Sequence, residues 1–139
     1  MKLFQMTVTY QRQTGEDTPG LVKESYVASG MTPADVQNQV LKEIAPFVFG
    51  DLEVPSIRKR NFFEVLKDEG KSFYYEAKVQ MITIDGDKEV RKEVLLLVQA
   101  DTVTDAAHAL DKELQSYDCE VISIIKSNIV DVFYASSEA

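Results

Sequence analysis

The sequence predicts an α+β protein: an internal duplication of a ββαβ unit, with antiparallel sheets, two helices and a pseudo-twofold relation between the halves. The stretch from Asp51 to Leu66 recurs, 67 positions later, from Asp118 to Phe133. Each copy follows a segment with helical spacing, and each such segment follows two runs of β-forming residues. We therefore expect a single domain, 1–139, built of a first repeat (2–66), a second repeat (73–133) and a flexible tail (134–139).

The first helix is expected over residues 32–44. Thr32 suits the N-cap, Pro33 suits the first helical position, and Asp35 suits the positive end of the helix dipole. The apolar residues then recur at helical spacing, which predicts one buried face formed by Val36, Val40, Ile44 and Phe47.

The second helix is expected over residues 102–114. Thr102 would cap it and Asp105 stands three positions further on, as in the first helix. Its predicted buried stripe contains Val103, Ala106, Ala107, Leu110 and Leu114.

Two strand-like runs precede each helix, at 2–11 and 21–29 in the first half and at 73–84 and 89–100 in the second. The letters DGDK between the second pair indicate a short hairpin. The apolar run Val94–Val98 predicts a central strand that is covered on both faces. The connector KDEGKS between the repeats is short, so we expect the two halves to share one core.

The repeated closing stretch contains a local conflict. A regular strand would place Lys59 and Asn61 in the same row as Ile57 and Phe63. A bend or β-bulge between two short strands resolves this, and Asn tolerates the left-handed backbone that such bends use.

A functional alternative is a paired polar site with one copy from each half, formed by Lys59, Asn61, Lys126 and Asn128. Ammonium and amide groups in such a pair suit an anionic ligand with twofold symmetry, such as a cyclic dinucleotide.

The composition of the chain excludes several classes of function. A net charge of −8 argues against avid, sequence-independent binding of duplex DNA, which needs a positive surface. The single cysteine, Cys119, excludes an intramolecular disulfide and fits a reducing compartment. The longest apolar run is too short to cross a bilayer. We expect a cytoplasmic protein without a membrane partner.

The basic stretch Arg58, Lys59 and Arg60 has two interpretations. Basic residues beside Phe62 and Phe63, with Tyr74 and Tyr75 close in sequence, resemble a surface for single-stranded nucleic acid, on which phosphates contact cations and bases stack on aromatic rings. The same charges could instead protect a strand at the edge of a sheet against aggregation.

No enzyme motif, metal-ligand spacing or cofactor fingerprint occurs in the sequence, so we expect no catalytic residue, no metal and no cofactor. His108 is expected to be solvated. Cys119 aligns with Leu52 and is expected to be a small buried hydrophobic residue. Acidic residues gather in two predicted turns, where solvated charge explains them: Glu16 and Asp17, and Asp85, Asp87 and Glu89.

The aromatic-rich first strand, the T-x-x-D helix starts and the closing pattern SI-x-K-x-N resemble domain-of-unknown-function family 4494. The resemblance extends from Leu3 to Phe133 and implies a small protein of Bacteroidetes bacteria or of their phages and mobile elements. It implies no cofactor. The family's first strand begins with Trp-Phe, whereas this chain has Leu3-Phe4 there, Tyr74-Tyr75 in the second repeat, and no tryptophan.

These observations favour a non-enzymatic binding protein that contacts single-stranded nucleic acid or an anionic, nucleotide-like ligand. The alternative is an oligomeric protein–protein interaction or assembly factor without a small ligand. The candidate ligand-binding residues are Arg58, Lys59, Arg60, Asn61, Lys126 and Asn128.

Overall fold

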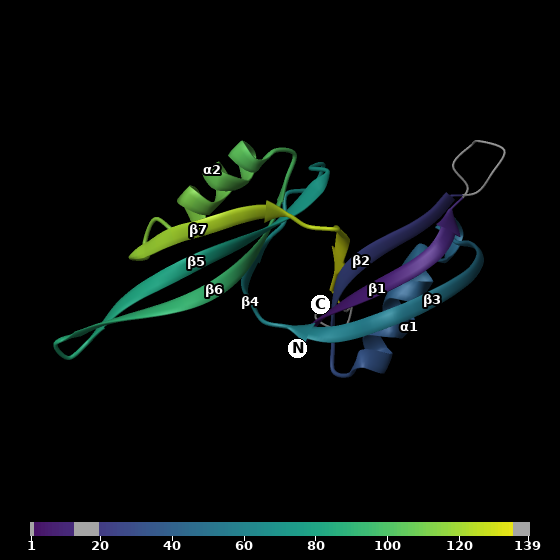
Figure 1. Ribbon diagram of the computed structural model, residues 1–139, viewed down its shortest axis with the longest axis horizontal. Helices are drawn as coiled ribbons and strands as arrows, with labels where there is room; N and C mark the ends of the chain where they lie inside the picture. Colours follow the sequence, from purple (N-terminus) through teal and green to yellow (C-terminus); the bar gives the residue numbers. More distant parts are fainter. Residues whose placement is uncertain (1, 13–19, 135–139) are drawn as a thin grey trace. The chain divides into compact units, whose positions relative to one another are not determined.

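Two helices and eight strands follow one another along the described residues, 2–12 and 20–134, of a computed structural model (Figure 1). The predicted tail from 135 on and the acidic pair Glu16 and Asp17 lie outside these residues. The elements, in chain order, are β1 (Lys2–Arg12), β2 (Gly20–Gly30), α1 (Pro33–Ile44), η1 (Ala45–Phe47), β3 (Phe49–Arg60), β4 (Phe62–Leu66), β5 (Phe73–Asp85), β6 (Lys88–Ala100), α2 (Val103–Glu113), β7 (Cys119–Lys126) and β8 (Ile129–Phe133).

Both helices begin where the sequence predicts. The Thr32 hydroxyl accepts a hydrogen bond from the backbone N–H of Asp35 (3.2 Å), and the Thr102 hydroxyl accepts one from Asp105 (3.1 Å). Each hydroxyl satisfies one of the N–H groups that a helix start leaves without an intrahelical partner. The two helices therefore begin with the same cap, but Phe47 and Val103, which the sequence predicted to be buried, are exposed.

The strands form two four-stranded sheets with the orders β3-β1-β2-β8 and β4-β6-β5-β7. The long hairpins β1–β2 and β5–β6 are antiparallel, whereas β8 runs parallel to β2 and β4 runs parallel to β6. The α+β class is therefore confirmed, but the sheets are mixed and not purely antiparallel. In reverse, the second order is β7-β5-β6-β4, so that β7, β5, β6 and β4 occupy the places that β3, β1, β2 and β8 occupy in the first sheet.

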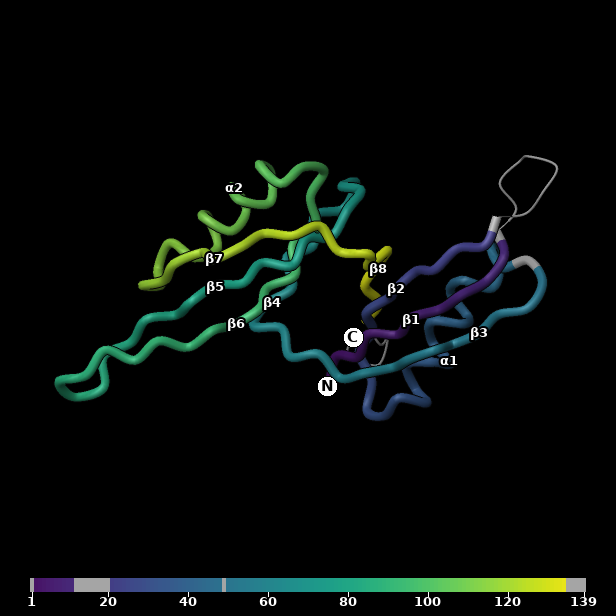
Figure 2. The backbone as a smooth tube through the Cα atoms, viewed as in Figure 1, coloured from purple at the N-terminus to yellow at the C-terminus, as the bar shows by residue number. Residues whose placement is uncertain are grey.

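The last strand of each half belongs to the sheet of the other half (Figure 2). One compact unit contains the described residues up to Arg60 and those from Asn128 on, and the other contains Asn61–Ser127. We call them unit 1 and unit 2. Their boundaries differ from the repeat boundaries that the sequence predicts, because β4 and β8 are exchanged between the two sheets.

The exchanged strands β8 and β4 pair with β2 and β6 in the same register. Tyr26, Val27 and Ala28 of β2 lie opposite Asp131, Val132 and Phe133 of β8. In unit 2, the corresponding residues Leu96, Leu97 and Val98 of β6 lie opposite Glu64, Val65 and Leu66 of β4. The strands that the sequence aligned as repeats therefore occupy equivalent positions in the two sheets.

Each unit has its own hydrophobic cluster, where the sequence predicted one shared core. In unit 1, α1 packs on Phe4, Met6 and Val8 of β1. In unit 2, α2 packs on Tyr75, Ala77 and Val79 of β5. A short connector does not force a shared core, because the exchanged strands already join the halves.

The closing stretches do break into two strands each, as the conflict in their pattern predicted. The first break falls at Asn61 and the second at Ser127 and Asn128. No described residue other than glycine has a positive φ, so the predicted left-handed asparagine is wrong. The break instead serves to direct the chain from one sheet into the other.

Candidate interaction site at the sheet edges

All four edge strands come from the repeated closing stretches, and the longer edge of each sheet is β3 in unit 1 and β7 in unit 2. Among the described residues, β3 pairs with β1 and β7 pairs with β5, each on one side. A strand at a sheet edge presents unpaired backbone N–H and C=O groups, which can pair with another chain. The side chains on these two edges therefore decide whether they are protected.

The basic stretch lies on β3. Lys59 pairs with Phe4, so its side chain belongs to the helix-covered face of the sheet. Arg58 pairs with Gln5 and Arg60 with Leu3, which places both arginines on the opposite face. Arg60 also donates a hydrogen bond to the Gln5 side chain. The three cations are neighbours along the strand, but they do not form a single row.

Lys126 occupies in β7 the position that Lys59 occupies in β3. It pairs with Tyr75, the counterpart of Phe4, and its Nζ lies 3.4 Å from the centroid of the Phe73 ring. This contact is a cation–π interaction, which contributes about 0.5–1 kcal/mol at an exposed site. Lys126 therefore has a stabilising contact within unit 2.

The two asparagines stand at the chain breaks. Asn61 is exposed between β3 and β4. The carbonyl oxygen of Asn128 accepts a hydrogen bond from the backbone N–H of Ser25 (3.2 Å), which starts the pairing of β8 with β2. Of the predicted site residues, the structure groups Arg58, Lys59, Arg60 and Asn128 in unit 1, and Asn61 and Lys126 in unit 2.

Burial removes two aromatic residues from the nucleic-acid interpretation. Tyr74 and Tyr75 are buried within unit 2, so neither ring offers a face for a base. Phe63 is 40% exposed, and its ring meets that of Tyr117 edge to face, with the centroids 5.7 Å apart. The Phe63 ring therefore stays partly accessible.

Matched positions on the two edges differ in chemistry. One of the two register irregularities of β3 lies around Pro55, and the irregularity of β7 lies around Ile122. Three positions later, β3 has Arg58 where β7 has Ile125. Proline lacks an N–H donor and arginine opposes apolar association, so β3 has two devices that protect edge strands. The β7 strand has isoleucine at both positions.

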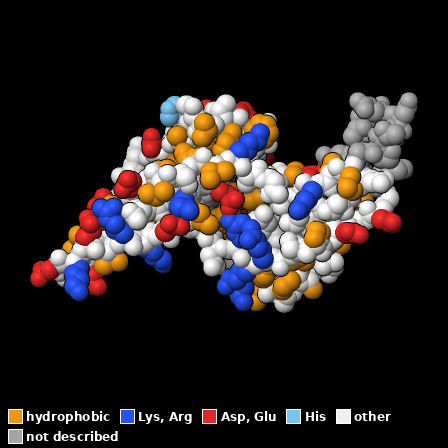
Figure 3. All heavy atoms as spheres, in the orientation of Figure 1, with side chains coloured by type: hydrophobic (Ala, Val, Ile, Leu, Met, Phe, Trp, Pro, Cys, Tyr) orange, Lys and Arg blue, Asp and Glu red, His pale blue; other side chains and the backbone are white. Residues whose placement is uncertain are grey.

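The β7 edge is apolar between its ends. Ile122 is 50% exposed and Ile125 is 64% exposed. The residues from Val121 to Ile125 include no charge. Hydrophobic side chains reach the visible surface over α2 and β7 (Figure 3). The sequence analysis did not predict this edge as a site. Its signal in the sequence was the charge-free run VISII (121–125), which aligns with VPSIR (54–58) in the first closing stretch.

Unit 1 also contains a buried polar cluster. The Glu24 carboxylate accepts hydrogen bonds from the hydroxyl of Tyr10 (2.5 Å) and from that of Tyr26 (3.1 Å). Burial, and secondly the charge of Glu24, raise the pKa of Tyr26. The carboxylate is thus compensated by two hydroxyl donors, which makes it part of the fold. In unit 2 the matched residue is Val94.

Cys119 is partly buried and packs against the unit 2 cluster, as Leu52 does in unit 1. Burial raises the pKa of its thiol, and the nearby carboxylates of Asp118 and Asp111 raise it further. A raised pKa lowers the fraction of reactive thiolate at neutral pH. This environment supports the predicted structural role of Cys119.

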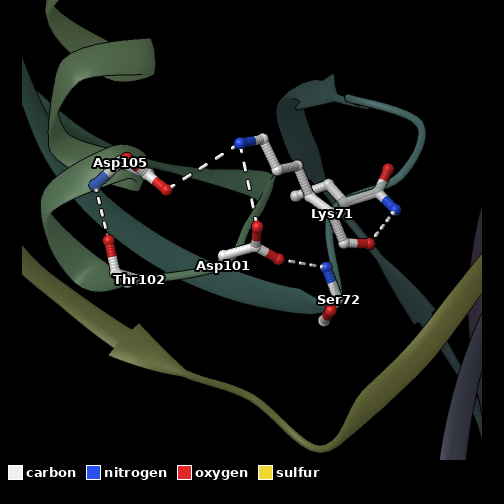
Figure 4. Close-up of polar contacts among 6 residues, drawn as sticks. Lys71, Ser72, Asp101, Thr102 and Asp105 are labelled. Carbon is white, nitrogen blue, oxygen red and sulfur yellow. Dashed lines mark hydrogen bonds and ion pairs between the residues drawn. The ribbon is translucent and has the colours of Figure 1, made fainter.

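The connector before β5 is fixed by polar contacts with the start of α2 (Figure 4). Lys71 Nζ lies 3.8 Å from Asp101 and 4.0 Å from Asp105, and the backbone N–H of Ser72 donates to Asp101 (2.8 Å). The buried Gln99 accepts from the N–H of Asp68 and donates to the carbonyl oxygen of Lys71 (both 3.0 Å). These ion pairs and hydrogen bonds therefore fix the connector between β4 and β5 in place.

Within the residues that the structure describes, no three His, Cys, Asp or Glu side chains are arranged to hold a metal ion. No described helix is long and apolar enough to cross a membrane. His108 is exposed on α2, as expected.

No curated protein is significantly similar to the chain. The family described as Domain of unknown function (DUF4494) matches residues 2–135, which is nearly the whole chain. The chain belongs to this family.

Proposed function

We propose that this protein is a non-enzymatic, cytoplasmic binding protein of a bacterium or its phage, and that it holds an extended segment of a partner protein against β7. One observation carries the proposal: β7 has Ile122 and Ile125 where the matched edge strand β3 has Pro55 and Arg58. In strand addition, backbone hydrogen bonds supply affinity and alternate side chains supply specificity.

The apolar contribution can be estimated from exposure. Complete burial of an isoleucine side chain stabilises by about 1.5–3 kcal/mol. Because Ile122 and Ile125 are about half exposed, covering them on binding contributes about 1 kcal/mol each. Backbone pairing along β7 adds to this, which predicts a dissociation constant in the micromolar range or weaker.

The test is selection of heptapeptides from a random displayed library on the purified protein. Enriched peptides should be rich in β-branched residues and should bind in fluorescence polarisation. Ile125→Arg, which copies the protection found in β3, should weaken binding at least about tenfold. Peptides that are N-methylated at alternate residues should also bind weakly, because they lack the donors that strand pairing needs.

Leu21→Arg is the matched control, since Leu21 is exposed, as Ile125 is, but lies on β2 of unit 1 and not on the β7 edge. It should leave peptide binding unchanged. If sedimentation shows a dimer that Ile125→Arg dissociates, the partner strand belongs to a second copy of this chain. Equal binding by wild type and Ile125→Arg would refute the proposal.

Single-stranded nucleic acid is a second candidate partner, favoured by the placement of Arg58 and Arg60 on one face of β3. The phosphate contacts of these residues should retard oligonucleotides at low salt, and the retardation should weaken steeply as salt is added. Arg58→Glu combined with Arg60→Glu should abolish the retardation. Lys23→Glu, at an exposed cation of β2, is the control. Absence of retardation by wild type at low salt would reject this candidate.

We further propose that the two halves arose by duplication and that the repeated Lys and Asn residues bind an anion. The equal registers of Lys59 with Phe4 and of Lys126 with Tyr75 support the duplication. In calorimetry with a cyclic dinucleotide, Lys59→Ala and Lys126→Ala should weaken binding to a similar degree. Unchanged binding in both variants would assign these residues to the fold alone.

A further inference from the structure

A hollow of about 310 Å³ opens on the helix-covered face of unit 2. Its apolar lining comes from β4, the β5–β6 hairpin and the segment after α2, and contains Phe63, Met81, Val90, Val94 and Tyr117. The exposed charges of Lys92 and Asp118 also border it. Sites for small ligands have volumes of roughly 300–1,000 Å³ and combine apolar walls with a few polar groups.

The corresponding place in unit 1 is filled. The pair Met81 and Lys92 in unit 2 matches the pair Tyr10 and Val22 in unit 1. Tyr10 is buried, and its ring belongs to the hydrophobic cluster of unit 1. Unit 1 therefore holds an aromatic ring where unit 2 has the thinner, unbranched Met81.

The loop after the helix differs as well. Seven residues, 45–51, separate the last buried helix residue Ile44 from Leu52 in unit 1, whereas four, 115–118, separate Leu114 from Cys119 in unit 2. Val48 of the longer loop packs against the unit 1 cluster. The shorter loop of unit 2 contributes Tyr117 and Asp118 to the wall of the hollow.

From this comparison we infer that the hollow binds a small molecule with one aromatic ring and a polar substituent, as in a phenol. The ring takes the place that the Tyr10 ring takes in unit 1. Phe63 and Tyr117 stand edge to face with their ring planes at 81°, so they offer a ring face and a ring edge to a third ring. Met81 adds a polarisable thioether, which contacts aromatic rings favourably. Lys92 and Asp118 suit the polar substituent.

The experiment follows the ¹³C-labelled methionine methyl groups by NMR during titration with p-cresol. The Met81 methyl signal should move upfield and saturate, with a dissociation constant below about 1 mM. The signals of Met6 and Met31, both in unit 1, should not move and serve as internal controls. No movement of the Met81 signal, or equal movement of the Met31 signal, overturns the inference.

Variants test the location and the ligand class. Met81→Tyr, which places in unit 2 the residue that unit 1 has, should reduce 4-fluorophenol binding at least tenfold by ¹⁹F NMR. Phe63→Ala removes a partly exposed wall without opening the cluster and should also weaken binding. Ile84→Tyr adds the same ring at an exposed position outside the lining and should change nothing.

The aromatic class is tested with 4-methylcyclohexanol, which has the size of p-cresol but no ring electrons. It should bind at least several-fold more weakly, and equal binding overturns the aromatic assignment. Ile125→Arg should leave p-cresol binding unchanged, because the hollow does not include the β7 edge. The site is therefore independent of the proposed strand addition.

Discussion

Replacing Val132 with alanine perturbs the strand exchange at the most buried side chain of β8, which is 1% exposed. The change removes two buried methyl groups, worth about 1.6 kcal/mol at about 0.8 kcal/mol each. A residual cavity adds to this at roughly 24 cal/mol per Å³. The expected loss in unfolding free energy is about 2–2.5 kcal/mol, and the melting temperature should fall by about 6–8 °C.

The location of the loss separates strand exchange from two independent repeats. Val132 follows β7 in sequence, but it lies opposite Val27 of β2. Hydrogen exchange measured by mass spectrometry should therefore show faster exchange in peptides from β1 and β2 than in wild type. Peptides from β5 and β6 should change less. Faster exchange confined to β5 and β6 would refute the exchanged topology.

Val130→Ala is the control on the same strand, because Val130 is 42% exposed whereas Val132 is 1% exposed. It should cost less than about 0.5 kcal/mol. The reciprocal variant, Leu66→Ala in β4, should accelerate exchange in unit 2, since Leu66 lies opposite Val98 and packs against that cluster.

Three further predictions concern local chemistry. Thr102→Ala should cost about 1 kcal/mol in urea unfolding, because the N–H of Asp105 loses its acceptor, and an unchanged midpoint would contradict the cap. A thiol reagent should label Cys119 slowly in the native protein at pH 7 and quickly in denaturant, since burial and nearby carboxylates raise the pKa of the thiol; rapid native labelling would contradict its packing. Burial and the charge of Glu24 raise the pKa of Tyr26 above the value of about 10 that it has in an unfolded chain. The unfolded state therefore releases the tyrosine proton at a lower pH than the folded state. The free energy of unfolding should fall as pH rises above about 10, by up to about 1.4 kcal/mol per pH unit. Tyr26→Phe should flatten this alkaline loss, and an equally steep loss in the variant would show that other groups cause it.

Local signals in the sequence predicted the local structure well. Thr32 and Thr102 start their helices, and the polar positions in the closing stretches coincide with breaks between strands. These features depend on residues within a few positions of one another, so that a short window contains the cause.

The partner of each closing strand was not predictable in this way. The run from Phe62 to Leu66 indicates a strand, but its pairing with β6 depends on the whole sheet. The similarity between the two closing stretches makes this harder, because each strand could find similar neighbours in either half. Sequence similarity between the repeats therefore could not distinguish a closed unit from an exchanged one.

The candidate site shows the same division. The sequence predicted the basic stretch as a site because a run of charges can be recognised from sequence alone, whereas the β7 edge is distinguished only by a lack of charged residues. Its meaning required the topology, which shows that β3 and β7 are both edges and so makes Pro55 and Ile122 comparable. The burial of Glu24 could have been predicted from the sequence, since the alternation of side chains along a strand places Glu24 in one row with Val22 and Tyr26.

The exchange also sets the order in which the two units can be completed during synthesis. Unit 2 is one continuous segment, Asn61–Ser127, whereas unit 1 needs β8 from the end of the chain. At about 5–20 residues per second, the ribosome takes on the order of several seconds to travel from β3 to β8. During that time β2 has no neighbour on its outer side, and the half of the protein that is made first is finished last.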